Sequence, residues 1–276
     1  MMERKMSELQ QRLLDMMVWF DAYCKENNLR YYIMGGTLLG AMRHGGFIPW
    51  DDDLDIGMPR KDYNRLKEIF NNDGRFELEM PDSLAKDFCY GHAKLFDTTT
   101  TLIENRRIDV KRGLYIDIFP IDGIGDDINT AKKNYRSIKL LNGLLVARTA
   151  AIRKGRSKFK NALALFFRII PESLFPTRNL RIKLDRLMSK YDFDQSSYVG
   201  NLLGLKLDGE IVPKEYFGIP QNVKFENAVL KMQAQPKKYL EHIYGNWEKL
   251  PPKEKQVTHH DFIMCDLNTP YKCKSK

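Results

Sequence analysis

Apolar residues follow two different spacings along this chain, and the change between them predicts a mixture of helices and strands. At the start they recur every three or four positions up to Cys24, which is typical of an amphipathic helix that ends near Asn27. Short apolar runs between turns follow and predict strands, and Pro59 introduces a further helix. The expected strands cover residues 31–34, 54–58, 76–80, 90–96, 101–104 and 114–119.

The second half of the chain departs from this pattern. Residues 131–191 have helical spacing, and Gly155, Pro171 and Pro176 are expected to separate the helices. After residue 198 the pattern shortens into turns and brief strands, including one at 224–232, and a helix is expected at Pro236–Tyr244. We therefore predict an α+β fold in which helices flank a mixed sheet. The expected parts are a catalytic core at 1–130, a basic helical insertion at 131–195, and a C-terminal segment at 196–276 that closes the core and the active site.

Basic charge is concentrated in the predicted insertion. Residues 132–190 contain sixteen Lys or Arg and two acidic residues, a net charge of +14, while the whole chain carries +9. The remaining residues therefore carry −5, so the basic segment and the predicted core differ in the sign of their charge.

Composition narrows the class of protein. A chain of 276 residues with 43% hydrophobic residues is long and apolar enough to bury a substantial core. No apolar run approaches the roughly 20 residues that cross a bilayer, and the N-terminus lacks the apolar stretch of a secretory signal. The four cysteines form no CxxC pair, which indicates free thiols in a reducing compartment. We expect a cytoplasmic protein.

The candidate chemistry lies in the run GGFIPWDDDLDIG at residues 45–57. Asp53 and Asp55 are separated by one apolar residue, so on a strand both carboxylates point to the same face. Two adjacent carboxylates repel each other, and a hard divalent cation such as Mg²⁺ or Mn²⁺ relieves that repulsion. We interpret Asp51 and Asp52 as a solvated acidic turn.

Two further features support a phosphate site. Gly35 and Gly36 are expected to form a turn after a strand, with Thr37 capping the helix that follows, and such a turn lets the backbone approach a phosphate. Asp117, in the alternating segment LYIDIF, is placed to supply a third carboxylate to the cation. A salt bridge to a core arginine explains a buried Asp117 equally well.

The run YYIMGGTLLGAMRHGGFIPWDDDLDIGMPRKDY resembles the signature of the LicD family, which includes bacterial phosphocholine transferases and is related to fukutin. The segments AKLFDTTT, YIDIFPIDG and PKKYLEHIYGNWEKLPP agree with it, and the match is loosest in the basic segment. The resemblance implies a nucleotidyltransferase-like fold. It also implies that Asp53, Asp55 and Asp117 hold the metal and act in catalysis, and that Gly35, Gly36 and Thr37 bind the donor phosphates.

Other residues are candidates for contacts with the substrates. Arg43 suits bidentate phosphate binding, and Lys94, within an apolar strand, is predicted to face a phosphate. Asp97 would either orient Lys94 or cap the next turn. The remaining candidates for substrate binding are His44, Trp50, His259 and His260, for which a structural or plain surface role is the alternative.

The function implied by the resemblance is transfer of a phospho-alcohol, foremost phosphocholine, from a CDP-linked donor such as CDP-choline, with release of CMP. The acceptor would be a sugar hydroxyl of a teichoic acid, lipopolysaccharide or capsule precursor. The rival enzyme is a nucleotidyltransferase that moves NMP from an NTP to a sugar or an antibiotic. Outside enzymes, the alternative is a basic protein that binds nucleic acid or a membrane.

The basic segment admits several interpretations. It has no nucleic-acid motif and few aromatic residues arranged for base stacking, so we do not expect a nucleic-acid partner. Residues 162–170, flanked by Lys158, Lys160, Arg178 and Arg181, could place an amphipathic helix on the anionic inner face of a bacterial membrane. An ordinary basic face packed over core leucines, or an anionic glycan acceptor, would account for the same charge.

Overall fold

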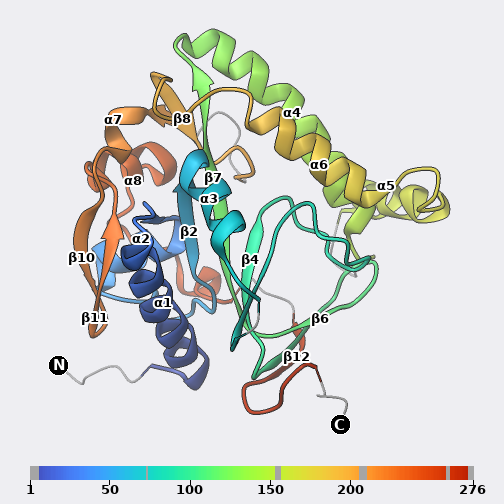
Figure 1. Cartoon of the computed structure of the whole chain (residues 1–276), viewed down its shortest axis with the longest axis horizontal. Helices are drawn as coiled ribbons and strands as arrows, with labels where there is room; N and C mark the ends of the chain where they lie inside the picture. The colour runs from blue at the N-terminus through green and yellow to red at the C-terminus, as the bar shows by residue number, and fades with distance from the viewer. Residues whose placement is uncertain (1–5, 73, 153–156, 205–209, 259–261, 273–276) are drawn as a thin grey trace.

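The computed structural model describes residues 6–72, 74–152, 157–204, 210–258 and 262–272, which form a mixed α and β fold (Figure 1). The helices are α1 (Glu8–Glu26), α2 (Gly35–His44), α3 (Arg60–Ile69), α4 (Ile128–Thr149), α5 (Lys158–Ile169), α6 (Thr177–Met188), α7 (Lys214–Phe217), α8 (Pro236–Tyr244) and the 3₁₀ turn Lys253–Lys255. The strands are β1 (Tyr32–Ile33), β2 (Asp55–Pro59), β3 (Phe76–Glu79), β4 (Ala93–Asp97), β5 (Thr101–Glu104), β6 (Val110–Arg112), β7 (Tyr115–Gly125), β8 (Tyr198–Gly200), β9 (Ile211–Pro213), β10 (Gln221–Phe225), β11 (Ala228–Met232) and β12 (Phe262–Asp266).

The main sheet is mixed, with β2 and β7 running parallel at its centre. Its strand order is β1-β2-β7-β4-β3, and β8 extends it by pairing with the far half of β7 and with β9. The pairs flanking β2 and β7 are antiparallel. Strands β5, β6 and β12 form a second sheet, and β10 with β11 forms a hairpin. The α+β class predicted from the spacing of apolar residues is confirmed.

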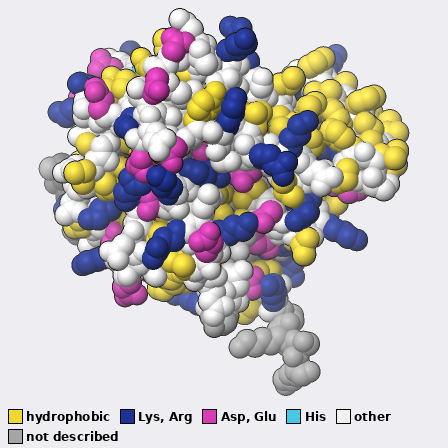
Figure 2. Space-filling view, turned by 45° about the horizontal axis from the view of Figure 1, so that its top comes forward, with side chains coloured by type: hydrophobic (Ala, Val, Ile, Leu, Met, Phe, Trp, Pro, Cys, Tyr) yellow, Lys and Arg dark blue, Asp and Glu magenta, His cyan; other side chains and the backbone are white. Residues whose placement is uncertain are grey.

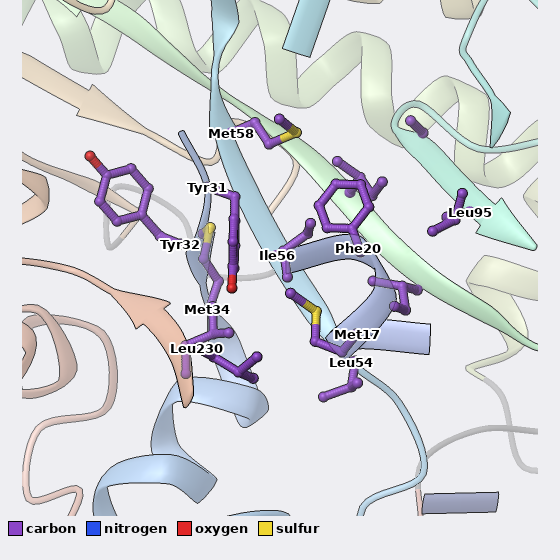
Figure 3. Packing of buried hydrophobic residues seen from close by; sticks show 14 of the residues in the cluster. Met17, Phe20, Tyr31, Tyr32, Met34, Leu54, Ile56, Met58, Leu95 and Leu230 are labelled. Carbon is purple, nitrogen blue, oxygen red and sulfur yellow. The ribbon is translucent and has the colours of Figure 1, made fainter. Parts of the chain in front are cut away.

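One face of the central sheet is covered by α1, whose capping box of Ser7 and Gln10 fixes its first turn. Figure 3 shows Met17 and Phe20 of α1 lying with Ile56 and Leu95 in one apolar cluster. Because side chains alternate along a strand, the residues next to Ile56 and Leu95 point to the opposite face. That opposite face carries the polar residues of the site.

Helices α4, α5 and α6 occupy residues 128–188 and lie together along one side of the molecule (Figure 1). Apolar residues of α4 and α6 form a second, smaller core with Leu202 and Ile211. The expected breaks at Pro171 and Pro176 lie between α5 and α6, and the expected helix Pro236–Tyr244 is α8. Cys24, Cys89 and Cys265 carry free thiols, as predicted.

Several boundaries differ from the sequence prediction. Helix α2 begins at Gly35, with Met34 as its N-cap, so Gly35 and Gly36 form the first turn of a helix and not a separate turn. Strand β2 begins at Asp55, so Asp53 lies before the strand. Strand β7 continues to Gly125, because its far half pairs with β8. The strand expected at 224–232 is a hairpin that reverses at Glu226, which has a φ of 54°.

Candidate active site

Three charged residues lie in one row across the centre of the sheet. Asp55 of β2 is opposite Asp117 of β7, and Asp117 is opposite Lys94 of β4. Residues directly opposite each other on neighbouring strands point to the same face of the sheet. Asp55 and Asp117 are therefore neighbours on the face that α1 leaves uncovered.

Asp117 is paired with a lysine and a histidine. Its Oδ1 lies 2.8 Å from Lys94 Nζ and 2.9 Å from His92 Nε2. These two groups hold the pKa of the buried Asp117 carboxyl well below its usual range. The alternative to a metal role was a salt bridge to a core arginine, and the cation beside Asp117 is instead Lys94, with His92 as a second partner. Both contacts use Oδ1, which leaves Oδ2 as the oxygen available to a cation.

Lys94 is one of the most buried cations of the chain. Its side chain is 2% exposed, and its Nζ lies 3.2 Å from the centroid of the Tyr115 ring, between that ring and the carboxylate of Asp117. Glu104 Oε1 lies 3.8 Å from the same nitrogen. Two carboxylates and an aromatic face compensate the ammonium, which would otherwise be costly to bury. The role of Lys94 as a phosphate contact stays a prediction.

Asp55 has the opposite environment to that of Asp117. Its pKa is raised well above the usual value, first by burial and then by the charges of Asp53, Asp117 and Asp51, while the charge of Lys94 acts in the opposite direction. Among the described residues, no Lys, Arg or His lies within 4.0 Å of its carboxylate. Uncompensated negative charge in a partly buried position is the electrostatic condition under which a divalent cation binds.

The backbone around Asp55 is fixed by α2. The Asp55 N–H donates to Thr37 Oγ1 at 2.9 Å, so Thr37 anchors β2 and does not cap the helix. A Cβ on Gly35 would lie 2.9 Å from Asp55 Oδ2, and one on Gly36 would lie 2.6 Å from Asp51 Oδ2. Gly35 also has a φ of 54°, which glycine adopts most easily. The glycines therefore let two carboxylates approach the N-terminus of α2.

The acidic turn before β2 belongs to the same region. The ligand oxygens of Asp51, Asp52 and Asp53 lie within 4.8 Å of one another, while within the described part of the chain Asp53, Asp55 and Asp117 form no group that tight. Asp53 still contributes to the field at Asp55, so the predicted trio is electrostatically connected. These hard carboxylate oxygens fit Mg²⁺ or Mn²⁺. Asp51, which we interpreted as solvated, lies against the N-terminus of α2.

A cavity of about 470 Å³ opens beside this row. Its lining includes Gly35, Gly36 and Asp55 from the predicted core, and His92, the partner of Asp117. The opposite walls come from α4 and α8, so all three predicted parts of the chain contribute to it. The N-terminus of α2 and a nearby carboxylate pair give the cavity the elements of a site for a phosphate with its cation.

Other predicted residues lie away from this cavity. Arg43 is at the C-terminal end of α2, roughly 12 Å along the helix from Gly35 at about 1.5 Å per residue. Its Nη1 donates to the carbonyl of Trp247 at 2.9 Å. His44 lies beside Arg43 and is exposed, and its ring is 6.4 Å from that of Trp50.

Asp97 lies at the far end of β4 from the site. It accepts hydrogen bonds from the N–H of Thr99 at 3.0 Å and from Arg75, which agrees with the turn-capping alternative. These contacts hold its pKa below the usual value despite its burial. His259 and His260 lie outside the described residues.

The sequence analysis did not identify several residues of the cavity. His92 precedes Lys94 by two positions, so strand alternation could have placed both on one face. Asn142, Glu210 and Tyr244 come from distant segments and carried no local signal. Burial and the nearby charge of Asp55 raise the pKa of Tyr244, so its hydroxyl stays protonated at neutral pH.

Comparisons with known proteins identify similar sequences. The family model described as LicD/FKTN/FKRP, nucleotidyltransferase domain, matches residues 28–138. This range includes α2 and the strands β2, β4 and β7 of the main sheet. Lipopolysaccharide cholinephosphotransferase LicD of Haemophilus influenzae is 29% identical over 269 residues, which is 93% of this chain and 97% of that protein.

Two eukaryotic proteins are similar over shorter stretches. Mannosyltransferase regulator 4 of Saccharomyces cerevisiae is 34% identical over 121 residues, 40% of this chain and 10% of that protein. Ribitol 5-phosphate transferase FKRP of Homo sapiens is 46% identical over 41 residues, 15% of this chain and 8% of that protein. The resemblance predicted from the sequence is confirmed: residues 28–138 match the LicD/FKTN/FKRP nucleotidyltransferase domain, and similarity to LicD extends over nearly the whole chain.

Proposed function

We propose that this protein transfers phosphocholine from CDP-choline to a sugar hydroxyl of a cell-surface glycan precursor and releases CMP. The observation that carries the proposal is the pair Asp55 and Asp117, side by side on parallel strands next to a cavity that also reaches the N-terminus of α2. Similarity along nearly the whole length of a lipopolysaccharide cholinephosphotransferase supports the choice of donor and acceptor.

The metal would be held by Asp53, Asp55 and Asp117. Bound there, Mg²⁺ or Mn²⁺ would neutralise the diphosphate of the donor and stabilise the departing nucleotide phosphate. The raised pKa of Asp55 supports this assignment, because the carboxylate lacks a positive partner among the described residues.

The chain's own groups would orient the donor and manage the proton. The N–H groups of Gly35 and Gly36, at the start of α2 on the cavity wall, would bind a phosphate oxygen. Asp117 would accept the proton of the attacking hydroxyl, as predicted from the sequence. His92 and Lys94 keep the pKa of Asp117 low, so this carboxylate is ionised at the start of each turnover.

The rest of the cavity would select the substrates. Helices α4 and α8 form walls opposite Asp55, and they present apolar, aromatic and amide side chains such as Leu145, Tyr244 and Asn142. A wall from the insertion would cover the donor and limit hydrolysis by water. Lys94, already paired with Asp117, would act by holding that carboxylate in place.

A donor screen tests the proposal. The protein would be incubated with Mg²⁺, a glycan-precursor preparation, and CDP-choline, CDP-ribitol or an NTP in separate reactions, followed by analysis of the nucleotides. Release of CMP from CDP-choline is the expected result. Release of CMP from CDP-ribitol alone would show that the transferred alcohol is ribitol and not choline. Release of pyrophosphate from an NTP would overturn the proposal in favour of nucleotidyl transfer.

A further inference from the structure

An apolar stripe runs along the outer side of α5. Phe159, Ala162, Phe166 and Ile169 are three, four and three residues apart, the spacing of one helix face. Phe159 and Ile169 are both 75% exposed, and Phe166 is 59% exposed. In Figure 2, hydrophobic side chains gather on the projecting lobe at the right, which is the α5 end of the molecule in Figure 1. The name α5 stripe is used below for these four residues.

The α5 stripe is not the side that α5 uses for packing. The buried residues of the helix are Ala164 and Phe167, and Leu165 and the following Leu174 are also exposed. The sequence analysis gave as one alternative that this basic segment packs over leucines of the core. Leu165 and Leu174 are exposed, so this alternative is wrong for these two leucines. Most of the apolar surface of α5 has no cover from the described part of the chain.

A buried arginine fixes α5 in this outward position. Arg148 of α4 is 1% exposed and donates to the carbonyls of Phe167 and Ile170, the latter at 2.6 Å, at the end of α5. It also contacts Glu172 at 2.9 Å. A guanidinium at the C-terminus satisfies carbonyls that the helix leaves unpaired. The exposed stripe is thus the result of a specific anchor, and not of a frayed end.

Positive charge surrounds the stripe. Lys158, Lys160 and Arg168 lie on α5 and are exposed, and residues 157–171 contain no acidic residue. The nearest acidic residue in the sequence, Glu172, is paired with Arg148. Arg107 donates to the carbonyl of Arg168 and adds a further cation nearby. Aromatic and aliphatic side chains bordered by lysine and arginine match the composition of a surface that binds anionic lipid.

We infer that α5 docks on an anionic lipid bilayer, with the α5 stripe among the acyl chains and its basic residues at the headgroups. Twelve residues give a helix of roughly 18 Å, which can lie in the interface, and none of the described helices is long and apolar enough to cross a membrane. A second copy of this chain is a poorer occupant, because two such basic faces would repel each other.

Docking would bring the cavity to the membrane surface. Asn142 and Leu145 of α4 line the cavity, and Arg148, further along the same helix, holds α5. An acceptor carried by a lipid would then be presented to the site without leaving the bilayer. The inference is independent of the proposed function, because binding to lipid requires no catalytic residue.

Co-sedimentation with liposomes tests the inference. The full chain would be mixed with vesicles of phosphatidylcholine alone or with phosphatidylglycerol, at low and high salt. The test variant is F166E/I169E, and the matched control is I219E/V229E, which adds the same charge at residues that are 78% and 57% exposed elsewhere. Thermal unfolding of all three proteins shows whether each variant is folded.

Wild type and control are expected to bind phosphatidylglycerol vesicles, more weakly at high salt, and the test variant is expected to bind at least about tenfold more weakly. Equal binding of the test variant would overturn the inference, since charge alone would then explain binding. So would absence of binding by wild type at low salt, self-association through α5 in place of lipid binding, or a preference for nucleic acid that the test variant retains.

Discussion

Carboxylates at the two ends of the strand pair β2 and β7 differ in their ion pairs. At one end Asp55 has no cation within ion-pair distance among the described residues, and its neighbours Asp53 and Asp117 add negative charge. At the other end Asp122, which is fully buried, receives both Nε and Nη2 of Arg60 at 2.6 and 2.7 Å. Arg60 also contacts Asp185 at 2.6 Å.

The difference separates a paired structural carboxylate, Asp122, from the proposed metal ligand Asp55. A bidentate arginine satisfies both oxygens of Asp122 and joins the sheet to α6, so that carboxylate needs no ligand. The charges around Asp55 disfavour its ionised form, and the cation proposed above would relieve this repulsion. The presence of an aspartate in a strand therefore says less about its role than the sum of the charges around it.

The largest expected effect is on transfer at the uncompensated end. Asp55→Asn should lower the rate of CMP release by about 10²–10³-fold, because the amide cannot hold the cation as a carboxylate does. Asp53→Asn should act in the same direction. The matched control is Asp82→Asn, an exposed carboxylate paired with Lys67, which should keep wild-type activity. A folded Asp55→Asn protein with normal turnover would contradict the proposal that Asp55 holds the metal.

At the compensated end the expected effect is on stability. Arg60→Met leaves Asp122 buried without its partner and should lower the free energy of unfolding by about 3–5 kcal/mol, measured by urea denaturation. The double variant R60M/D122L should recover much of this loss, since it removes the unpaired charge. If R60M abolished transfer while the free energy of unfolding stayed unchanged, the structural role assigned to the Arg60–Asp122 pair would be wrong.

Substitution of Asp117 should affect both transfer and stability. Asp117→Asn leaves the ammonium of Lys94 without its closest carboxylate, and we expect a loss of about 3 kcal/mol in the free energy of unfolding as well as loss of transfer. Asp55→Asn should instead raise the stability of the metal-free protein by about 1 kcal/mol, because it removes repulsion. Destabilisation by both variants would contradict the assigned difference between these carboxylates.

The smallest expected effect is on pH dependence. The pKa of Asp55 is raised in the folded protein, so its ionised form is disfavoured and metal-free stability should increase as the pH falls toward the usual carboxyl range. Asp117, with a lowered pKa, should lose its contribution only in stronger acid. Protons should also compete with the cation, so Mn²⁺ affinity measured by calorimetry should be weaker at about pH 5 than at about pH 7.5.

Asp55→Asn provides the control for that experiment. In this variant the stability of the metal-free protein should vary less with pH between neutrality and the usual carboxyl range than in wild type. The same pH profile in both proteins would show that another group controls the change.

Local sequence patterns predicted most of the elements and suggested the kind of chemistry. The spacing of apolar residues predicted α1 and α8, the prolines predicted the division of the basic helices, and the aspartate run identified the acidic site. These signals concern neighbours in the chain, which helix and strand geometry connect directly. The prediction of a separate turn at Gly35 was wrong, because glycine can adopt the backbone conformation of a loop and also that of the first turn of a helix.

The balance of charge and exposure was decided by tertiary structure. Lys94 and His92 contact Asp117 directly but not Asp55. The cavity joins residues as distant as Asp55 and Tyr244, and the apolar side of α5 faces outward because Arg148 holds the helix there. Each depends on groups far apart in the sequence. Electrostatic and packing energies act through space, so the chain specifies them only after folding has brought these groups together.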